Sequence, residues 1–152
     1  MKAVIQRVKY ASVKVDSVEI GKCGQGFLIL LGVGNEDSQK DVEVLGNKIM
    51  KLRVFEDEEG KMNRSIQEIG GEMLIISQFT LYADCRKGNR PSFTKAAPPS
   101  VSKPLYEAFV EMIRKTGIHA ECGEFGADMK VELLNDGPVT IVLESKEMMR
   151  NE

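Results

Sequence analysis

The segment Gly24-Gln25-Gly26-Phe27-Leu28-Ile29-Leu30-Leu31 opens on two glycines and continues as five consecutive apolar side chains. An apolar run of this length, bounded by glycines, is typical of a β-strand that is buried on both faces. The apolar stretch ends at Gly34 and is far too short to cross a bilayer. We therefore expect the fold to be organised around a central strand over these residues.

Further strands and two helices are expected around this strand. Ser38 is a suitable N-cap for a first helix, and a second helix is expected from about Ser102 to Thr116, ended by Gly117. Strand patterns occupy the remaining apolar segments, which are residues 2–10, 12–20, 73–81, 118–122, 130–134 and 139–144. Turns are expected at Asp16-Ser17 and at Asn135–Pro138. The order is not a regular βαβ alternation. It predicts an α+β fold, a curved and mostly antiparallel sheet or barrel with two packed helices.

Length and composition limit the class of protein. The 152 residues fit a single domain, with a tail after about residue 145 that we expect to be flexible. The net charge of −2 excludes a uniformly basic nucleic-acid-binding protein. One histidine cannot build a two-histidine zinc site, and no cofactor or metal is indicated. Three scattered cysteines and a start without a signal-peptide pattern predict a cytoplasmic location and no membrane association.

Residues 85–106 carry positive charge without any acidic residue. The segment contains four of the five prolines, and its cations are Arg86, Lys87, Arg90, Lys95 and Lys103. Such a loop within an acidic protein is suited to binding a polyanion, and Phe93 offers a surface on which a base can stack. A solvated surface loop explains the same composition equally well.

Two short polar segments are candidates for chemistry. Ser77-Gln78-Phe79-Thr80-Leu81 ends an apolar segment, where main-chain amides can form an oxyanion hole and Thr80 can act as a nucleophile or proton relay. Ordinary polar strand residues are the simpler interpretation. Asn135-Asp136-Gly137-Pro138-Val139-Thr140 is a strong turn signal, and a plain hairpin is again the simpler interpretation. A cis Gly137–Pro138 bond would instead point neighbouring carbonyl oxygens the same way.

Taken together, these segments resemble the D-aminoacyl-tRNA deacylase (DTD) family over nearly the whole chain, from Met1 to about Glu144. Residues 77–81 are similar to the first family signature and residues 135–140 to the second. Arg7-Val8 followed by Ala11-Ser12-Val13, and Gly88-Asn89-Arg90-Pro91-Ser92-Phe93, are also similar to family sequences. Two separated signatures in the right order are far more specific than either alone.

The resemblance implies a homodimeric enzyme that hydrolyses the ester between a D-amino acid and the 3′ end of tRNA. It also implies removal of glycine wrongly attached to alanine tRNA. By the same resemblance, a cis Gly137-Pro138 unit enters the partner subunit's active site, and Arg7 holds this turn through its carbonyls. An L side chain would collide with the main-chain carbonyls, whereas a D side chain points away and glycine has none.

The catalytic groups expected from this reasoning are main-chain amides around Gln78 and Phe79, with Ser77 beside the substrate. The attacking group would be water, assisted by the 2′-hydroxyl of the terminal ribose, and Thr80 is a candidate nucleophile. Arg86, Lys87, Arg90 and Lys95 are expected to hold the acceptor stem or CCA end. The alternatives are an RNA-binding module without catalysis and a Thr-dependent hydrolase of small esters.

Overall fold

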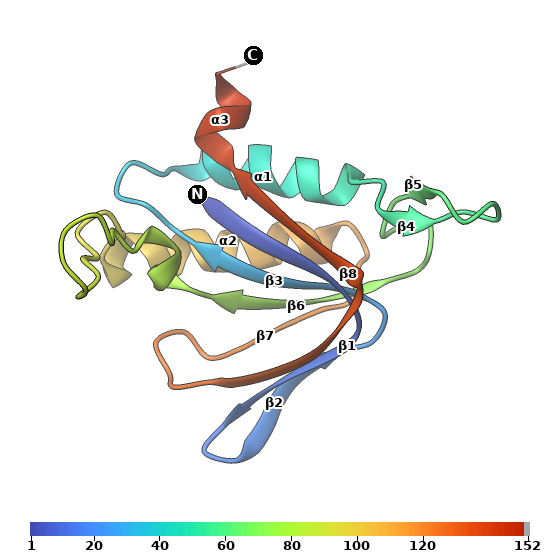
Figure 1. The fold of residues 1–152 in the computed structure, drawn as a ribbon, viewed down its shortest axis with the longest axis horizontal. Coiled ribbons are helices and arrows are strands. Elements are labelled where there is room, and N and C mark those ends of the chain that lie inside the picture. The colour runs from blue at the N-terminus through green and yellow to red at the C-terminus, as the bar shows by residue number, and fades with distance from the viewer. Residues whose placement is uncertain (151–152) are drawn as a thin grey trace.

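A curved sheet covered on one face by two long helices makes up the fold (Figure 1). This computed structural model describes residues 1–150. The strands are β1 (Lys2–Val15), β2 (Val18–Cys23), β3 (Gly26–Gly32), β4 (Phe55–Glu56), β5 (Met62–Arg64), β6 (Glu72–Ser77), β7 (Ala120–Cys122) and β8 (Lys130–Glu144). The helices are α1 (Gln39–Lys51), the 3-10 helix η1 (Phe79–Tyr82), α2 (Pro99–Lys115) and α3 (Ser145–Met149).

Strand β1 organises the sheet because it pairs with three partners. Its first half pairs with β3 and its second half with β2, while β8 runs antiparallel along both halves. The sheet order is β2-β1-β3-β6-β7, and the β3–β6 and β6–β7 pairs are parallel. This change of partner curls the sheet and brings its two edge strands, β2 and β7, together. There the main-chain N–H of Lys22 on β2 donates to Glu121 Oε1 on β7 at 3.0 Å. The predicted α+β class with a curved, mostly antiparallel sheet is confirmed.

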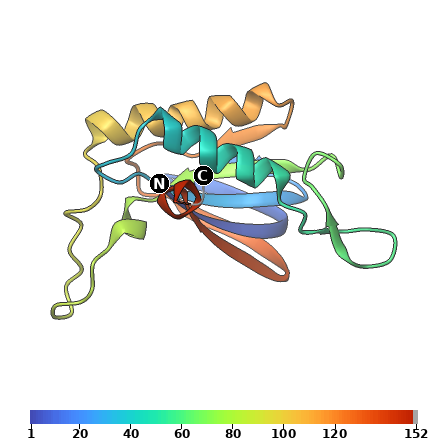
Figure 2. The same ribbon diagram turned by 90° about the horizontal axis from the view of Figure 1, so that it is seen from above.

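The apolar run that defines β3 is buried from Phe27 to Leu31, with only Leu30 partly exposed. Both sides of the strand face apolar clusters. Helices α1 and α2 lie side by side over one face and contribute Val42, Leu45, Phe109 and Ile113 to the larger cluster (Figure 2). A smaller cluster fills the inside of the curl, with Val8, Val13, Leu28 and Leu74 among its members. Burial on both faces explains why the strand has no polar alternation.

Three predicted boundaries can be compared with the structure. Helix α1 starts after Ser38 as expected, and the Ser38 N–H donates to Asp41 Oδ2 at 2.9 Å. Helix α2 begins at Pro99, three residues before the predicted start at Ser102, because proline fits the first position of a helix. The apolar segment 73–81 was predicted as one strand, but β6 ends at Ser77, where its parallel partner β3 also runs out, and η1 follows.

The predicted hairpin at Asn135–Pro138 is wrong. Strand β8 continues from Lys130 to Glu144 through this segment and does not reverse direction. In contrast, the predicted turn at Asp16-Ser17 does join β1 to β2, with φ values of 50° and 67°. The tail begins as helix α3 with Ser145 buried, and residues 151–152 lie outside the described residues. No helix within residues 1–150 is long and apolar enough to cross a membrane.

Candidate functional site

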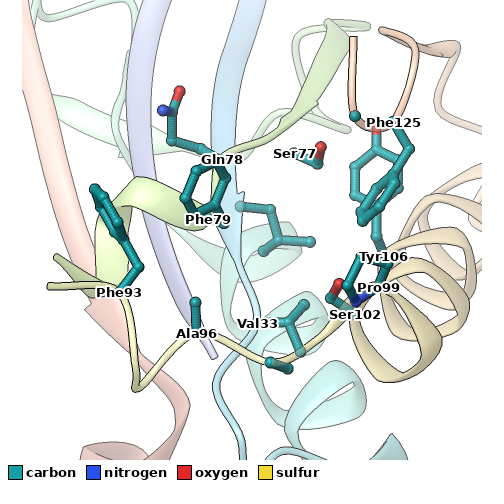
Figure 3. Close-up of a pocket in the computed structure, with 13 residues that line it drawn as sticks. Val33, Ser77, Gln78, Phe79, Phe93, Ala96, Pro99, Ser102, Tyr106 and Phe125 are labelled. Carbon is teal, nitrogen blue, oxygen red and sulfur yellow. The ribbon is translucent and has the colours of Figure 1, made fainter.

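A pocket of about 390 Å³ lies where β3 and β6 end. Its walls come from the β6–η1 junction, the loop before α2, the first turns of α2 and the loop after β7 (Figure 3). Aromatic side chains face each other across it, with Phe79 and Phe93 on one side and Tyr106 and Phe125 on the other. The lining residues are Leu31, Val33, Ser77, Gln78, Phe79, Phe93, Ala96, Ala97, Pro99, Ser102, Tyr106, Phe125 and Gly126.

The main chain at the β6–η1 junction provides free donors. The Gln78 N–H is not among them, because it donates to the Leu31 carbonyl at 2.8 Å and continues the β3–β6 ladder. The N–H groups of Phe79 and Thr80 have no acceptor among residues 1–150. They open a 3-10 helix, where the first donors lack intrahelical partners. Of the amides expected around Gln78 and Phe79, that of Gln78 is already paired, and those of Phe79 and Thr80 are free to bind a ligand.

Thr80 has no general base beside it. Its Oγ1 accepts a hydrogen bond from the side-chain amide of Gln78, which cannot take up a proton. The chain's one histidine, His119, lies at the opposite end of β6, where its carbonyl accepts from the Met73 N–H at 3.0 Å. His119 Nε2 instead lies 2.6 Å from Glu121 Oε2. The structure thus gives Thr80 no activating partner within the described chain.

Sequence reasoning missed several members of the pocket. Tyr106 is buried, and its hydroxyl donates to the Ile75 carbonyl at 2.6 Å. Burial raises the pKa of Tyr106, so the hydroxyl stays protonated. The helical spacing that predicted Phe109 and Ile113 also covers Tyr106 and could have found it. No sequence signal pointed to Phe125, which reaches the pocket from the loop after β7.

Arg7 faces a bulge that lies within the second signature segment, residues 135–140. Gln6 pairs with Thr140 and Val8 with Asn135, so the four residues 136–139 lie opposite Arg7 alone. Arg7 is 6% exposed, and its Nε donates to the Asp136 carbonyl at 2.9 Å. Its Nη1 donates to the Val54 carbonyl at 2.7 Å. The peptide bond between Gly137 and Pro138 is cis, and both residues are exposed.

The bulge and the pocket are separate within one chain. Arg7 pairs with Phe27 near the start of β3, whereas the pocket lies beyond Leu31 at the other end of that strand. Four strand residues correspond to about 13 Å along the sheet. The structure therefore brings Ser77, Gln78, Phe79 and Thr80 together, and separately Arg7, Gly137 and Pro138.

The loop between η1 and α2 projects from the body of the protein (Figure 2). Asp84 and Ser92 close its base through two main-chain hydrogen bonds of 2.7 and 2.9 Å. Asp84 also holds Arg86, whose Nη2 lies 2.7 Å from Oδ2, and these hydrogen bonds lower the pKa of Asp84 to about 2. Lys95 Nζ lies 3.9 Å from the same carboxylate. The four predicted cations are therefore unequal, because Asp84 partly neutralises two of them.

The other two cations, Lys87 and Arg90, are exposed, and their side chains make no hydrogen bond or ion pair within residues 1–150. They are the residues of this loop with unneutralised charge. A cluster of three or more His, Cys, Asp and Glu side chains that could bind a metal is also missing from the described part of the chain.

Residues 4–144 match the family described as D-Tyr-tRNA(Tyr) deacylase. The chain belongs to this deacylase family. A D-aminoacyl-tRNA deacylase of Desulfatibacillum aliphaticivorans is 58% identical over 96% of this chain and all of its own length. One from Thermosipho africanus is 55% identical over 97% of this chain and 99% of its own.

Solved structures agree with this deacylase fold. A c-Myc DNA unwinding element binding protein, 47% identical, superposes with a TM-score of 0.89 and covers 95% of this chain and 98% of its own. A probable eukaryotic D-amino acid tRNA deacylase, only 16% identical, shares the fold at a TM-score of 0.81 over 93% of this chain and 97% of its own.

Proposed function

We propose that this member of the deacylase family hydrolyses the ester of D-aminoacyl-tRNA and releases the D-amino acid and tRNA. The observation that carries the proposal is an aromatic pocket with two free main-chain amides at its edge, next to a loop with unneutralised cations. An aminoacyl ester is already activated, so polarising its carbonyl supplies much of the catalysis required. A tRNA substrate also agrees with the expected cytoplasmic location.

The amides of Phe79 and Thr80 polarise the ester carbonyl in this proposal. Water attacks with assistance from the 2′-hydroxyl of the terminal ribose, because Thr80 has no base to activate it. The pocket takes the terminal adenosine, since bases stack well on aromatic side chains. Thr80→Ala should then retain substantial activity, and a substrate ending in 2′-deoxyadenosine should react slowly. Near-complete loss in Thr80→Ala with intact tRNA binding would support the nucleophile instead.

Two substitutions at one position separate the amide from the side chain. Phe79→Pro removes the N–H, and proline suits this first position of η1 because Gln78 before it lies outside the α-helical region, with φ −145° and ψ 84°. Phe79→Ala keeps the N–H and removes the ring. We expect kcat to fall about 100-fold or more in Phe79→Pro. Phe79→Ala should mainly raise KM. Equal effects of the two variants would contradict the amide mechanism.

We further propose that handedness is selected by the main chain of Gly137-Pro138, inserted into the pocket of a second copy. Pro138 is exposed, Arg7 supports the unit from behind, and the unit lies too far from its own chain's pocket to act there. Steric exclusion by carbonyl oxygens admits D-amino acids and glycine, so glycine on alanine tRNA is also a substrate. A homodimer with two such exchanges is closed by twofold symmetry.

A mixed dimer tests insertion between subunits. In Gly137→Ala, the added Cβ would lie 2.7 Å from Val139 Cγ2 and 3.1 Å from Arg7 Nη2, which displaces the unit and should reduce discrimination between D- and L-tyrosyl-tRNA. The Phe79→Pro subunit lacks a working pocket. A heterodimer of one Gly137→Ala subunit and one Phe79→Pro subunit is purified through two different tags. Its one working pocket belongs to the Gly137→Ala subunit and receives the unmodified Gly137 of the Phe79→Pro subunit. The wild-type D/L ratio should return; a ratio as poor as that of Gly137→Ala alone would place the filter within one chain.

One deacylation assay separates the proposed enzyme from its alternatives. The protein is incubated with D-tyrosyl-tRNA or L-tyrosyl-tRNA, and the remaining ester is followed with time. Loss of the D ester alone supports the proposal. A stable D ester on bound tRNA supports an RNA-binding module, and cleavage of small esters without tRNA supports a general hydrolase.

A further inference from the structure

Helix η1 carries Phe79 and Thr80 but has little packing of its own. It is four residues long, and none of its residues is buried. Its hydrogen bonds to neighbouring main chain are short-range, from the Leu81 N–H to the Gln78 carbonyl and from the Ala83 N–H to the Thr80 carbonyl. A segment of this kind needs an external support to hold two amides at a fixed position.

Tyr82, the last residue of η1, provides this support by packing on glycines. A Cβ added at Gly34 would lie 2.8 to 2.9 Å from three atoms of the Tyr82 ring and hydroxyl, and one at Gly32 would lie 3.1 Å from Leu81 Cβ and 3.3 Å from Tyr82 Cδ2. The ring therefore lies directly against the main chain that follows β3. It also contacts a cation, because Lys2 Nζ lies 4.8 Å from the ring centroid.

Asp37 fixes the hydroxyl end of Tyr82. The Tyr82 hydroxyl donates to Asp37 Oδ2 at 3.4 Å, and burial raises the pKa of Tyr82, so the donor stays protonated. The Asp37 side chain is 2% exposed. The same oxygen accepts the Gly34 N–H at 2.7 Å and lies 2.7 Å from the Met1 amino group. Asp37 is thus itself held from two other directions.

The segment that supports Tyr82 also holds the loop before α2, which forms another wall of the pocket. The Ala97 N–H donates to the Val33 carbonyl at 2.9 Å, and the Asn35 N–H donates to the Lys95 carbonyl at 3.2 Å. The Asn35 side chain adds a hydrogen bond of 2.7 Å to the Thr94 carbonyl. Residues 32–37 therefore set η1 and the loop before α2 relative to each other.

We infer that Tyr82, packed on Gly34 and hydrogen-bonded to Asp37, is a positioning residue that sets the place of the Phe79 and Thr80 amides for ester hydrolysis. The inference rests on the proposed role of these amides. Tyr82 does not line the pocket, so it acts through η1 and not on the substrate. Substitutions around it should lower kcat for D-tyrosyl-tRNA while tRNA binding and KM change little.

Gly34→Ala, Tyr82→Leu and the double variant form the decisive set. The methyl group added by Gly34→Ala would push the Tyr82 ring and η1 away, and a misplacement of about 1 Å can lower kcat roughly 100-fold. In Tyr82→Leu the ring is absent, so adding Gly34→Ala should cause no further loss. Gly24→Ala is the matched control, because its Cβ would meet only Glu72 Oε1 at 3.4 Å, an ordinary contact.

Tyr82→Phe keeps the ring and removes only the hydroxyl, so it decides the question if Gly34→Ala fails to fold. We expect kcat per folded molecule to fall several-fold with an unchanged melting temperature and an unchanged Kd for uncharged tRNA. Additive losses from Gly34→Ala and Tyr82→Leu, or unchanged kcat in Tyr82→Phe, would overturn the inference. Unchanged kcat in Phe79→Pro would instead overturn the proposed amide mechanism beneath it.

Discussion

Arg7→Met tests the support of the β8 bulge. The substitution keeps the length and apolar stem of the side chain and removes the guanidinium, which donates to the Asp136 carbonyl at 2.9 Å and the Val54 carbonyl at 2.7 Å. Both acceptors then lose a charged donor. The Val54 contact is buried, so no water replaces the lost donor, while the Asp136 contact is only partly buried.

The expected loss of stability follows from these two contacts. A hydrogen bond from a charged group contributes about 1.5–3 kcal/mol, and an unsatisfied buried carbonyl carries a further penalty of similar size. Partial exposure of the Asp136 side reduces the sum, so we expect the free energy of unfolding to fall by about 3–5 kcal/mol. With a urea m-value near 2 kcal/mol/M, the midpoint should fall by roughly 1.5–2.5 M.

Lys9→Met is the control for charge at the same bulge. Lys9 Nζ lies 3.4 Å from Asp136 Oδ2, but its side chain is 56% exposed, and exposed pairs contribute at most about 1 kcal/mol. Urea unfolding should therefore separate the two variants clearly. Deacylation of D- and L-tyrosyl-tRNA by Arg7→Met should show a D/L ratio at least about tenfold lower, a difference of about 1.4 kcal/mol. Equal midpoints for the two variants, or an unchanged D/L ratio in folded Arg7→Met, would refute the reasoning.

The remaining predictions concern acid stability and RNA binding. Burial raises the pKa of Asp41, but hydrogen bonds, that from Ser145 first, outweigh it and hold the pKa below its ordinary 3.8. This carboxylate stabilises the fold above about pH 4 and loses its effect as the pH falls through the lowered pKa. The difference in urea midpoint between wild type and Asp41→Asn should therefore shrink below about pH 4. A difference that stays constant with pH would contradict this. Arg90→Gln should weaken binding of uncharged tRNA and reduce the slope of log K against log salt by about 1. Arg86→Gln should have a smaller effect, because Asp84 already partly neutralises Arg86. Equal effects of the two variants in a salt titration would contradict the claim that Arg90 carries more unneutralised charge than Arg86.

The central strand and the two long helices were predictable because their signals are local. The run from Phe27 to Leu31 forms β3, and the Ser38 cap starts α1. The hairpin expected at residues 135–138 was wrong for a physical reason. Residues with turn propensity occur in bulges as well as in turns, and only the pairing of β8 with β1 on both sides of Arg7 distinguishes the two.

The candidate site was predictable only in part. The segment from Ser77 to Thr80 does line or adjoin the pocket, but the identity of the free amides depends on the Gln78–Leu31 hydrogen bond across two strands. The positive charge of the loop can be read from the sequence, but Asp84, one residue outside the segment considered, decides which of its cations remain unneutralised. The Gln78–Leu31 contact joins residues far apart in the chain and leaves no trace in local spacing, whereas Asp84 lies only two residues from Arg86.

The most direct test of backbone-based chiral selection compares glycyl, D-alanyl and L-alanyl esters on the same alanine tRNA. In the proposed filter, a wall of carbonyl oxygens would meet the first carbon of the side chain, so a single methyl group of the wrong hand would be enough for exclusion. We predict that the glycyl and D-alanyl esters are hydrolysed at comparable rates, whereas the L-alanyl ester is spared as fully as L-tyrosyl. Hydrolysis of L-alanyl-tRNA at a rate near that of glycyl-tRNA would show selection by side-chain size and contradict the account.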